Sequence, residues 1–269
     1  YGNISHIARP AHADYTGFLR YNGANDPRGG GHFSGRITAP LCFAGAVCAQ
    51  ILKHRGITTG AHIQSIKDVA DERFDPVNVT AEQLEQVKSR HFPTLSETAE
   101  EKMREVINAA RMDLNSVGGI VECAVVGFPA GIGSPMIDGL ENVISQLVFA
   151  IPAVKGIEFG NGFDCADIFG SDNNDDFTVR DGKIVTKTNN HGGILGGISS
   201  GMPIIFRAAF KPTPSISRPQ NSVDFKDITD RELIIKGRHD PCVVPRAVPC
   251  VEAALNIALV SALLKNPRI

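Results

Sequence analysis

The sequence predicts an α+β fold, because strand-like and helix-like patterns follow one another in mixed order and no internal repeat is visible. A chain of 269 residues with 42% hydrophobic content can bury a large core. Length alone allows one large domain or two small ones, and we expect a single domain over residues 1–269. Strands are expected at 60–66, 118–128, 154–159 and 203–210, and helices at 38–54, from Thr80, and at 98–112, 138–151 and 247–264.

Composition excludes several classes of protein. A net charge of −2 and a pI near 6.5 give no general attraction to nucleic acid or to an anionic membrane, so any anion binding must come from clustered arginines. The most apolar segment, 248–264, is interrupted by Glu252 and Asn256 and is expected to be a buried helix. The six cysteines contain no Cys-x-x-Cys pair, which favours reduced, buried thiols in a cytoplasmic protein and predicts no metal site.

The first chemical cluster lies at residues 9–15, where Arg9, His12 and Asp14 gather beside Pro10. The proline indicates a loop. His12 can act as a general acid, because a histidine carries or releases a proton near neutral pH. The alternative is a structural histidine that is satisfied by Asp14.

A glycine-rich turn at 26–36 runs into the predicted helix at 38–54, which is apolar enough to be buried. The N-terminal end of that helix therefore points at the triple glycine 29–31. Its backbone amides, with Arg28 and Arg36, suit a phosphate or a carboxylate. The alternative is a helix cap with solvated arginines.

The middle of the chain provides scaffold and surface. Thr98 with Glu101 predicts a capping box for the helix at 98–112, whose charged face is expected to be solvated. The strand at 118–128 ends in a rigid loop at 129–135, and Pro152 stops the following helix. Residues 161–188 are polar, and 172–176 is nearly all acid and amide. A flexible surface excursion is expected there, with a calcium loop as the alternative, although the required glutamate and glycine are absent.

Residues 189–217 combine five glycines, an apolar strand and a proline-stiffened end, Lys211-Pro-Thr-Pro-Ser215. The glycines permit left-handed backbone and close approach to a ligand, and the lysine with two hydroxyls suits a phosphate or flavin cradle. A glycine-rich hairpin with an exposed lysine is the alternative. The spacing matches neither a Walker loop nor a dinucleotide fingerprint. A second Arg-His-Asp cluster, with Arg238 and Asp240, precedes the final apolar helix.

Seven sequence blocks, taken in order over nearly the whole chain, resemble the chorismate synthase family. They are Arg9-Pro-Ala-His-Ala-Asp14, Arg28-Gly-Gly-Gly31 with Ser34 and Arg36, Gly127-Phe-Pro-Ala-Gly-Ile-Gly-Ser-Pro135, Ile151-Pro-Ala-Val-Lys-Gly156, Asn189-Asn-His-Gly-Gly-Ile-Leu-Gly-Gly197, Phe210-Lys-Pro-Thr-Pro-Ser215 and Arg238-His-Asp-Pro-Cys242. The resemblance implies a lyase that eliminates phosphate from 5-enolpyruvylshikimate 3-phosphate to give chorismate, with reduced FMN as cofactor. It also implies a sandwich of helices between antiparallel sheets, and a homotetramer.

The resemblance assigns roles by matching position. His12 is similar to the family histidine that protonates the flavin near N1, and Asp240 to the aspartate that assists proton removal at N5. Arg9, Arg36 and Arg238 look like substrate arginines. The positions that correspond to FMN-binding residues are His32, Phe33, Ser34, Pro152, Ala153, Gly196, Lys211, Pro212, Thr213, Pro214, Ser215 and Arg238.

Departures from the family pattern leave two further hypotheses. His32 and Phe33 stand where the family often has Arg-Ser, and Ile37 where it often has Glu. The family's N-terminal segment, with a Gly-Glu-Ser-His-Gly motif, is absent from this sequence, so a polypeptide that began at Tyr1 is expected to be a poor catalyst. The alternative function is a truncated flavin-binding module without turnover. An FMN-dependent redox enzyme is less favoured, because no dinucleotide fingerprint is present, which leaves NADPH to act only as an external reductant.

Overall fold

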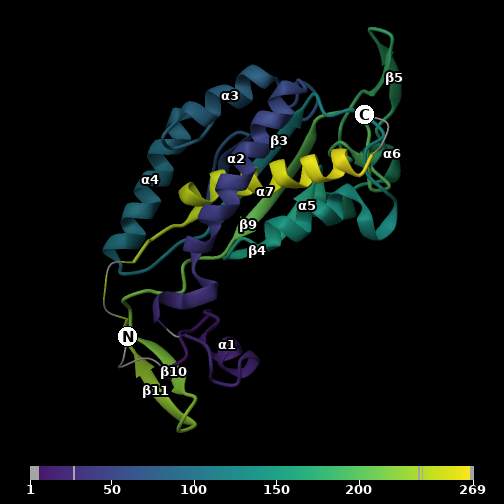
Figure 1. Cartoon of the computed structure of the whole chain (residues 1–269). Helices are drawn as coiled ribbons and strands as arrows, with labels where there is room; N and C mark the ends of the chain where they lie inside the picture. The colour runs from purple at the N-terminus through teal and green to yellow at the C-terminus, as the bar shows by residue number, and fades with distance from the viewer. Residues whose placement is uncertain (1–5, 27, 236, 238, 267–269) are drawn as a thin grey trace.

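The computed structural model describes residues 6–26, 28–235, 237 and 239–266. Its centre is a five-stranded antiparallel sheet with strand order β2-β1-β3-β9-β4 (Figure 1). The strands are β1 (Thr58–Ile66), β2 (Val69–Ala70), β3 (Gly119–Val126), β4 (Val154–Phe159) and β9 (Ile204–Phe210). The four strands predicted from the sequence are therefore confirmed, and they pair with partners far away along the chain. With the surrounding helices they form an α+β fold, as predicted.

Three helices cover one face of the sheet: α2 (Thr38–His54), α5 (Leu140–Phe149) and α7 (Val244–Leu264). Alternate side chains of the central strands, among them Val121, Cys123 and Phe206, point into this layer and are fully buried. Burial of one such large apolar side chain stabilises the fold by about 1.5–3 kcal/mol. The final helix starts three residues before the predicted Ala247, because Pro245 lies in the first turn, where a missing N–H costs nothing.

The other face of the sheet is covered by α3 (Ala81–Ser89), while α4 (Glu97–Met112) flanks β1 and β2. Leu84 and Val87 of α3 pack against Ala124 and Ile205 of the sheet. Thr80 and Gln83 form a reciprocal capping box at the start of α3. The predicted box at Thr98 is wrong: α4 begins after Ser96, whose side chain accepts a hydrogen bond from the backbone N–H of Ala99.

A row of charged side chains crosses this second face at paired positions of β1, β3, β9 and β4. His62 is opposite Glu122, and Arg207 is opposite both Glu122 and Glu158. His62 Nε2 lies 2.9 Å from Glu122 Oε2, and Arg207 Nε donates to Glu158 Oε1 at 2.6 Å. His62, Glu122 and Arg207 are all at most 4% exposed. A shift of any one strand by one residue would separate buried charges, so this charged row fixes the register of the sheet.

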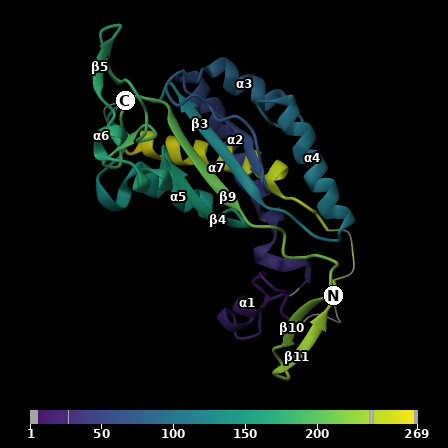
Figure 2. The ribbon, with the colours of Figure 1, turned by 180° about the vertical axis from the view of Figure 1, so that it is seen from behind.

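A small lobe extends from one end of this main body (Figures 1 and 2). It contains residues 6–26, with α1 (Asp14–Arg20), and a hairpin of β10 (Gln220–Asp224) and β11 (Thr229–Leu233). The N-terminal strand-like segment pairs with the hairpin, because Ala8 N donates to Val223 O at 3.1 Å. Aromatic contact adds to this pairing, with the rings of Phe18 and Phe225 4.6 Å apart between centroids.

Helix α2 has the predicted bounds, but the prediction that it is buried is wrong. Gly45 and Leu52 are its buried residues, whereas Phe43 is 76% exposed and Val47 and Ile51 are also exposed. Only the stripe that faces α7 is covered, because α2 forms the outer edge of the helix layer. By length and composition the helix 35–54 and α7 could each cross a membrane. In the helix 35–54, 11% of the most apolar 18-residue stretch is buried, whereas in α7 the buried share is 67%. Helix α7 is therefore a core helix.

The acidic segment 161–188 is exposed but anchored. It forms the short helices η5 (Gly162–Asp167) and α6 (Gly170–Asn173) and a hairpin of β5 (Phe177–Arg180) and β6 (Lys183–Thr186). Asp175 accepts hydrogen bonds from Thr188 Oγ1 at 2.6 Å and from Asn190 N at 2.8 Å. The expected flexible excursion is therefore tied to the turn that follows it. No group of three or more metal-ligating side chains occurs among the residues that the structure describes.

Candidate active site

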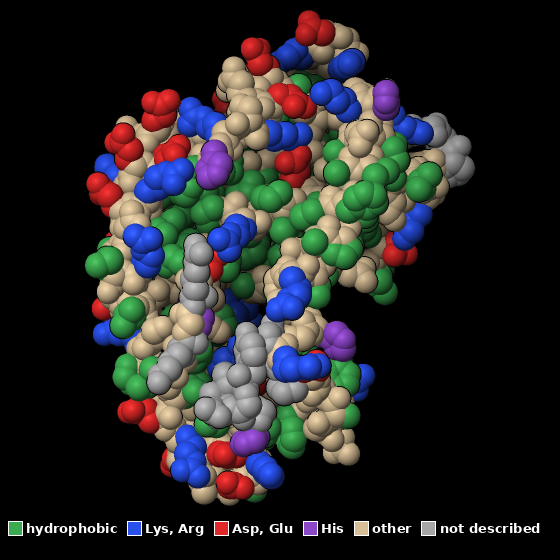
Figure 3. All heavy atoms as spheres, turned by 60° about the vertical axis from the view of Figure 1, so that its left-hand side comes forward, with side chains coloured by type: hydrophobic (Ala, Val, Ile, Leu, Met, Phe, Trp, Pro, Cys, Tyr) green, Lys and Arg blue, Asp and Glu red, His purple; other side chains and the backbone are tan. Residues whose placement is uncertain are grey.

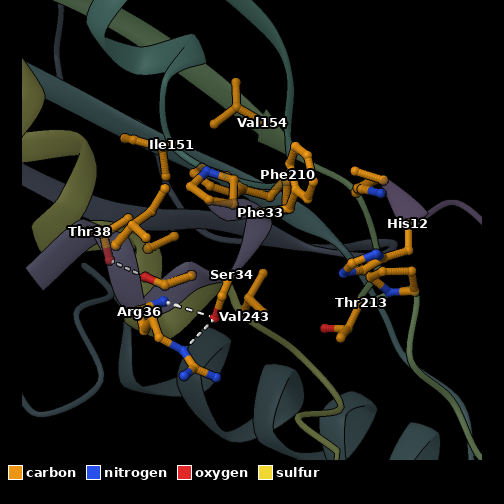
Figure 4. Close-up of a pocket in the computed structure, with 18 of the residues that line it drawn as sticks. His12, Phe33, Ser34, Arg36, Thr38, Ile151, Val154, Phe210, Thr213 and Val243 are labelled. Carbon is orange, nitrogen blue, oxygen red and sulfur yellow. Dashed lines mark hydrogen bonds between the residues drawn. The ribbon is translucent and has the colours of Figure 1, made fainter. Parts of the chain in front are cut away.

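A cavity of about 830 Å³ lies where the lobe meets the main body. Figure 3 shows a hollow on this side of the molecule, with Lys and Arg side chains near its edge. Its walls come from the lobe turn 9–13, the segment 32–38 that leads into α2, residues 149–154 after α5, the segment 210–215 after β9, and the start of α7. Segments that are far apart in the sequence thus converge on one site (Figure 4).

The lobe contributes a compact ion-pair cluster of Arg9, His12 and Asp14. Arg9 Nε and Nη2 donate to the two oxygens of Asp14, each at 2.7 Å, and His12 Nδ1 lies 2.7 Å from Asp14 Oδ1. Burial alone would raise the pKa of Asp14, but hydrogen bonds from Arg9 and His12 outweigh burial and hold this pKa well below its usual range. The charge of Arg9 is therefore neutralised by Asp14, and the His12 ring is held in place by the contact between its Nδ1 and the Asp14 carboxylate.

The glycine-rich turn packs against His12. Gly30 and Gly31 lie in the short helix η2 (Arg28–Phe33) with positive φ, and a Cβ on Gly30 would be 3.4 Å from His12 Nε2. The triple glycine thus serves a tight turn beside the histidine. Of the two arginines predicted here, Arg36 lines the cavity, whereas Arg28 pairs with Asp26 in solvent.

The start of α2 lies at the cavity, together with the segment that leads into it. Ser34 caps the short helix η3 (Gly35–Ile37), and its Oγ accepts from Arg36 N at 3.4 Å and from Arg36 Nε at 3.1 Å (Figure 4). The continuous run from His32 to Thr38 lines the cavity. This end of the helix layer therefore places the N-terminus of a helix and a guanidinium at the cavity, an arrangement that suits an anion.

An apolar wall stands beside these cationic groups. Its lining residues are Phe33, Ile151, Val154 and Phe210 (Figure 4). Pro152 and Ala153, which pattern alone had marked only as a helix stop, also line the cavity, and Ala153 has a φ of +76°. Ala153 O accepts from the backbone N–H of Lys211 at 3.0 Å, so the two sides of the wall are joined.

The segment 211–215 forms the side of the cavity near His12. Lys211 Nζ donates to Ala11 O, and its pKa is lowered by burial and by repulsion from Lys155. Thr213 Oγ1 is buried and has no hydrogen-bond partner among the residues described. Ser116 Oγ donates to Thr213 O at 2.7 Å and holds the segment in place. Pro212 is the one member of this predicted set that does not line the cavity.

The comparisons with known proteins agree with one another. The family model described as chorismate synthase matches residues 1–264. The chain belongs to the chorismate synthase family. Chorismate synthase of Lancefieldella parvula is 46% identical over 97% of this chain and 71% of its own length, and that of Pyrococcus abyssi is 47% identical over 98% and 72%. A crystal structure of chorismate synthase superposes with a TM-score of 0.77 at 28% identity, covering 94% of this chain and 70% of that one. Chorismate synthases are lyases, so the chain belongs to a family of lyases.

The chorismate synthase motif around Asp240 adds a residue that sequence reasoning missed. Arg246 Nη1 lies 2.7 Å from Asp240 Oδ2, and both residues line the cavity. Arg246 follows Pro245 in the first turn of α7, and the only signal in the sequence was a cation placed just before an apolar helix. Arg238, predicted to bind substrate and FMN, lies outside the described residues.

The glycine-rich motif at 189–201 does not line the cavity. Its glycines do adopt positive φ, but the backbone that they approach belongs to the protein: a Cβ on Gly193 would be 2.5 Å from Pro203 O. Gly196 lies in the turn of a hairpin of β7 (Ile194–Leu195) and β8 (Ile198–Ser199), away from the other predicted FMN residues. Of the segment 189–217, only the end at 210–215 lines the cavity, so the predicted cradle is limited to that end. The hairpin alternative accounts for the rest.

Proposed function

We propose that the cavity binds reduced FMN and 5-enolpyruvylshikimate 3-phosphate together, and that this chain carries out the phosphate elimination of its family there. One observation carries the proposal: a single cavity joins an apolar, partly aromatic wall to a set of cationic side chains. A flavin ring suits the wall, while a substrate with a phosphate and two carboxylates suits the cations. His12 and Asp240, the two predicted proton-transfer residues, line the same cavity.

The residues present fit FMN on two further counts. The volume of about 830 Å³ lies within the range of about 300–1,000 Å³ typical of small-molecule sites. The unpartnered Oγ1 of Thr213 is a buried polar atom that a ligand would satisfy. FMN would be held by His32, Phe33, Ser34, Pro152, Ala153, Lys211, Thr213, Pro214 and Ser215.

When bound, reduced FMN supplies the electron density that relieves the electron-deficient carbon left by the departing phosphate. The residues of this chain attract and orient the reactants. Arg36, Lys211 and Arg246 present positive charge to the cavity, and such charges favour the departing phosphate most as its negative charge grows. Arg9 is committed to Asp14 by two hydrogen bonds at 2.7 Å, so we assign Arg9 to positioning His12 rather than to holding phosphate.

Two side chains are assigned to proton transfer. Asp14 contacts Nδ1 of His12, so the other ring nitrogen, Nε2, is the one that would carry a proton to or from a bound flavin. Asp240 is held by Arg246 Nη1 and by the backbone N–H of Cys242 at 3.3 Å, and it would assist proton removal from the substrate beside a bound flavin. The ion pair with Arg246 holds the Asp240 carboxylate beside the cavity that both residues line.

We also propose a cytoplasmic homotetramer that takes electrons for its flavin from NADPH or another external reductant, with no nucleic-acid or membrane partner. The charge of −2 and the small-molecule site support the absence of a nucleic-acid partner. The exposed apolar residues of α2 support an assembly in which that helix is covered.

The test measures FMN binding and turnover separately. Thr213→Val keeps the shape of the side chain but removes the hydroxyl, and we expect reduced-FMN affinity to fall by about fivefold to tenfold, the loss of one hydrogen bond. Thr178→Val, in the β5–β6 hairpin outside the cavity, should leave the affinity unchanged. Anaerobic turnover of 5-enolpyruvylshikimate 3-phosphate is then followed by chorismate absorbance. Flavin binding without chorismate would favour the binding-module hypothesis, and absence of flavin binding would refute the proposal.

A further inference from the structure

Helices α2 and α7 approach unusually closely at one point. A Cβ on Gly45 of α2 would lie 2.3 Å from the Cβ of Ala253 on α7 and 2.4 Å from its Cα. A side chain of any size at position 45 would overlap α7, so the missing side chain of glycine allows the two backbones to meet. Asn256 Nδ2 also donates to Gly45 O at 3.4 Å, which holds the helices at this distance.

Two cysteines face each other one helical turn away from this contact. Cys42 and Cys250 are each three residues before Gly45 and Ala253, so they lie on the same faces of the same two helices. Their sulfur atoms are 3.7 Å apart, and the thiol of Cys42 donates to Cys250 Sγ. The thiol of Cys250 is directed to Arg246 O at 3.5 Å. Both cysteines are in the reduced form.

The pair is within reach of small molecules. Cys250 lines the cavity described above, although only 7% of its surface is exposed, and Cys42 is half-buried beside it. A molecule as small as hydrogen peroxide that enters the cavity therefore comes close to Cys250. Cys42 is the nearest partner for whatever forms there.

We infer that Cys42 and Cys250 are a reversible disulfide site, which a hydroperoxide oxidises and a thiol reduces, and which cross-links α2 to α7 in the cavity wall. The sulfur of Cys250 attacks one peroxide oxygen, the O–O bond breaks, and the thiol proton leaves with the hydroxide as water. The sulfur of Cys42 then attacks the resulting sulfenic acid and expels hydroxide, which takes the proton of Cys42. Two thiols and one hydrogen peroxide thus give one disulfide and two waters.

The geometry demands little movement. The sulfur atoms must close from 3.7 Å to about 2.05 Å, a change that side-chain rotation on two closely packed helices can supply. The pKa of the Cys42 thiol is raised to about 11, first by burial and then by the neighbouring Cys250. Cys42 is therefore a protonated thiol at neutral pH, and formation of the disulfide should take minutes to hours rather than seconds.

The bond would join two walls of the cavity. The cavity is lined by Thr38 at the start of α2 and by Val243 and Ala247 at the start of α7. The cross-link would therefore fix the spacing of these two helix ends. The two cysteines are 208 residues apart in the sequence, and a bond that closes so long a loop restricts the unfolded chain strongly. The oxidised protein should accordingly resist heating better than the reduced protein.

The experiment treats the whole protein with hydrogen peroxide, blocks free thiols, and maps disulfides by mass spectrometry after digestion. We expect a cross-linked peptide that joins Cys42 to Cys250, an intact mass lower by about 2 Da, and full reversal by dithiothreitol. Cys42→Ser should abolish the cross-link. Cys48→Ser, further along the same helix and also half-buried, is the matched control and should leave the cross-link in place.

The melting temperature provides a second readout. It should rise by a few degrees on oxidation of the wild type and remain unchanged on oxidation of Cys42→Ser. Peroxide that oxidises the exposed Cys165 while Cys42 and Cys250 stay unlinked would overturn the inference, and the wild-type peptide map decides this even if a variant does not fold. A cross-link that persists in Cys42→Ser would overturn it equally.

Discussion

Replacement of Asp14 by Asn tests the arrangement that holds His12. Asp14 accepts three hydrogen bonds from Arg9, at 3.0, 2.7 and 2.7 Å, and a fourth contact at 2.7 Å from His12. An Asn amide has one oxygen, so its NH₂ group would face the donors of Arg9 or His12 and at least one charge-assisted bond would be lost. These side chains are only 11–16% exposed, and the loss should cost about 2–3 kcal/mol.

The measurement is thermal unfolding at neutral pH. A cost of this size should lower the melting temperature by about 4–10 °C in a protein of this length. Asp26→Asn is the matched control, because Asp26 makes an ion pair of the same form, with Arg28 Nη2 at 2.7 Å, but in solvent. It should leave the melting temperature unchanged. Equal effects of the two substitutions would refute the claim that burial gives the Arg9–Asp14 pair its value.

The same variant has a defined pH dependence. Because the pKa of Asp14 is held below its usual range, its contribution to stability is complete above the unfolded value of about 3.9 and is lost as the pH falls through the folded value. The melting temperatures of wild type and Asp14→Asn should therefore converge as the pH is lowered from 5 toward 2. A constant gap over this range would show that the stabilisation does not depend on the charge of Asp14.

Three other predictions follow from the structure. His12→Ala and Asp240→Asn should each lower turnover by about tenfold to a thousandfold while reduced-FMN affinity stays nearly constant, and unchanged turnover would remove the residue from the proton-transfer assignment. The pKa of His62 would be lowered by its burial, but Asp71 and Glu122 outweigh this and raise it, so its stabilisation is complete below about pH 6.5 and is lost as the pH rises through the folded value. The melting-temperature gap between wild type and His62→Gln should thus narrow from pH 6 to pH 9, and a gap that widens would contradict the raised pKa. Gly45→Val should destabilise the protein by about 2–3 kcal/mol in chemical denaturation, because its Cβ would overlap Ala253, whereas Gly170→Val, where a Cβ meets nothing within 4 Å, should not.

The sequence predicted the local elements well, because apolar periodicity and proline or glycine stops act over a few residues. The strands β1, β3, β4 and β9 and the bounds of α2 illustrate this. The sequence did not predict how exposed α2 is. This helix is apolar in composition, but whether a helix is covered depends on elements far away in the chain. The cap at Ser96 was missed because Thr98 and Glu101 offered a better match to the same motif.

The candidate site was predicted in part for a related reason. Family motifs marked His12, Asp240 and the segment 211–215, and the cavity brings these together. The motif at 189–201 was equally marked, but its glycines solve a packing problem between backbones, and composition cannot distinguish such packing from ligand binding. Arg246 ends the second Arg-His-Asp cluster in the sequence, but its role becomes visible only when its contact with Asp240 is seen.

The order of strands in the central sheet constrains how the chain can be made. Strand β3 lies between β1 and β9, and β9 is some eighty residues further along the chain than β3. Until residue 210 has left the ribosome, β3 therefore has an unpaired edge, and the buried Glu122 lacks Arg207 as its neighbour. Nascent chains that stall before β9 has emerged should therefore be prone to aggregate through the exposed edge of β3. The sheet is completed late in synthesis, when β9 pairs with the free edge of β3 and brings Arg207 beside Glu122.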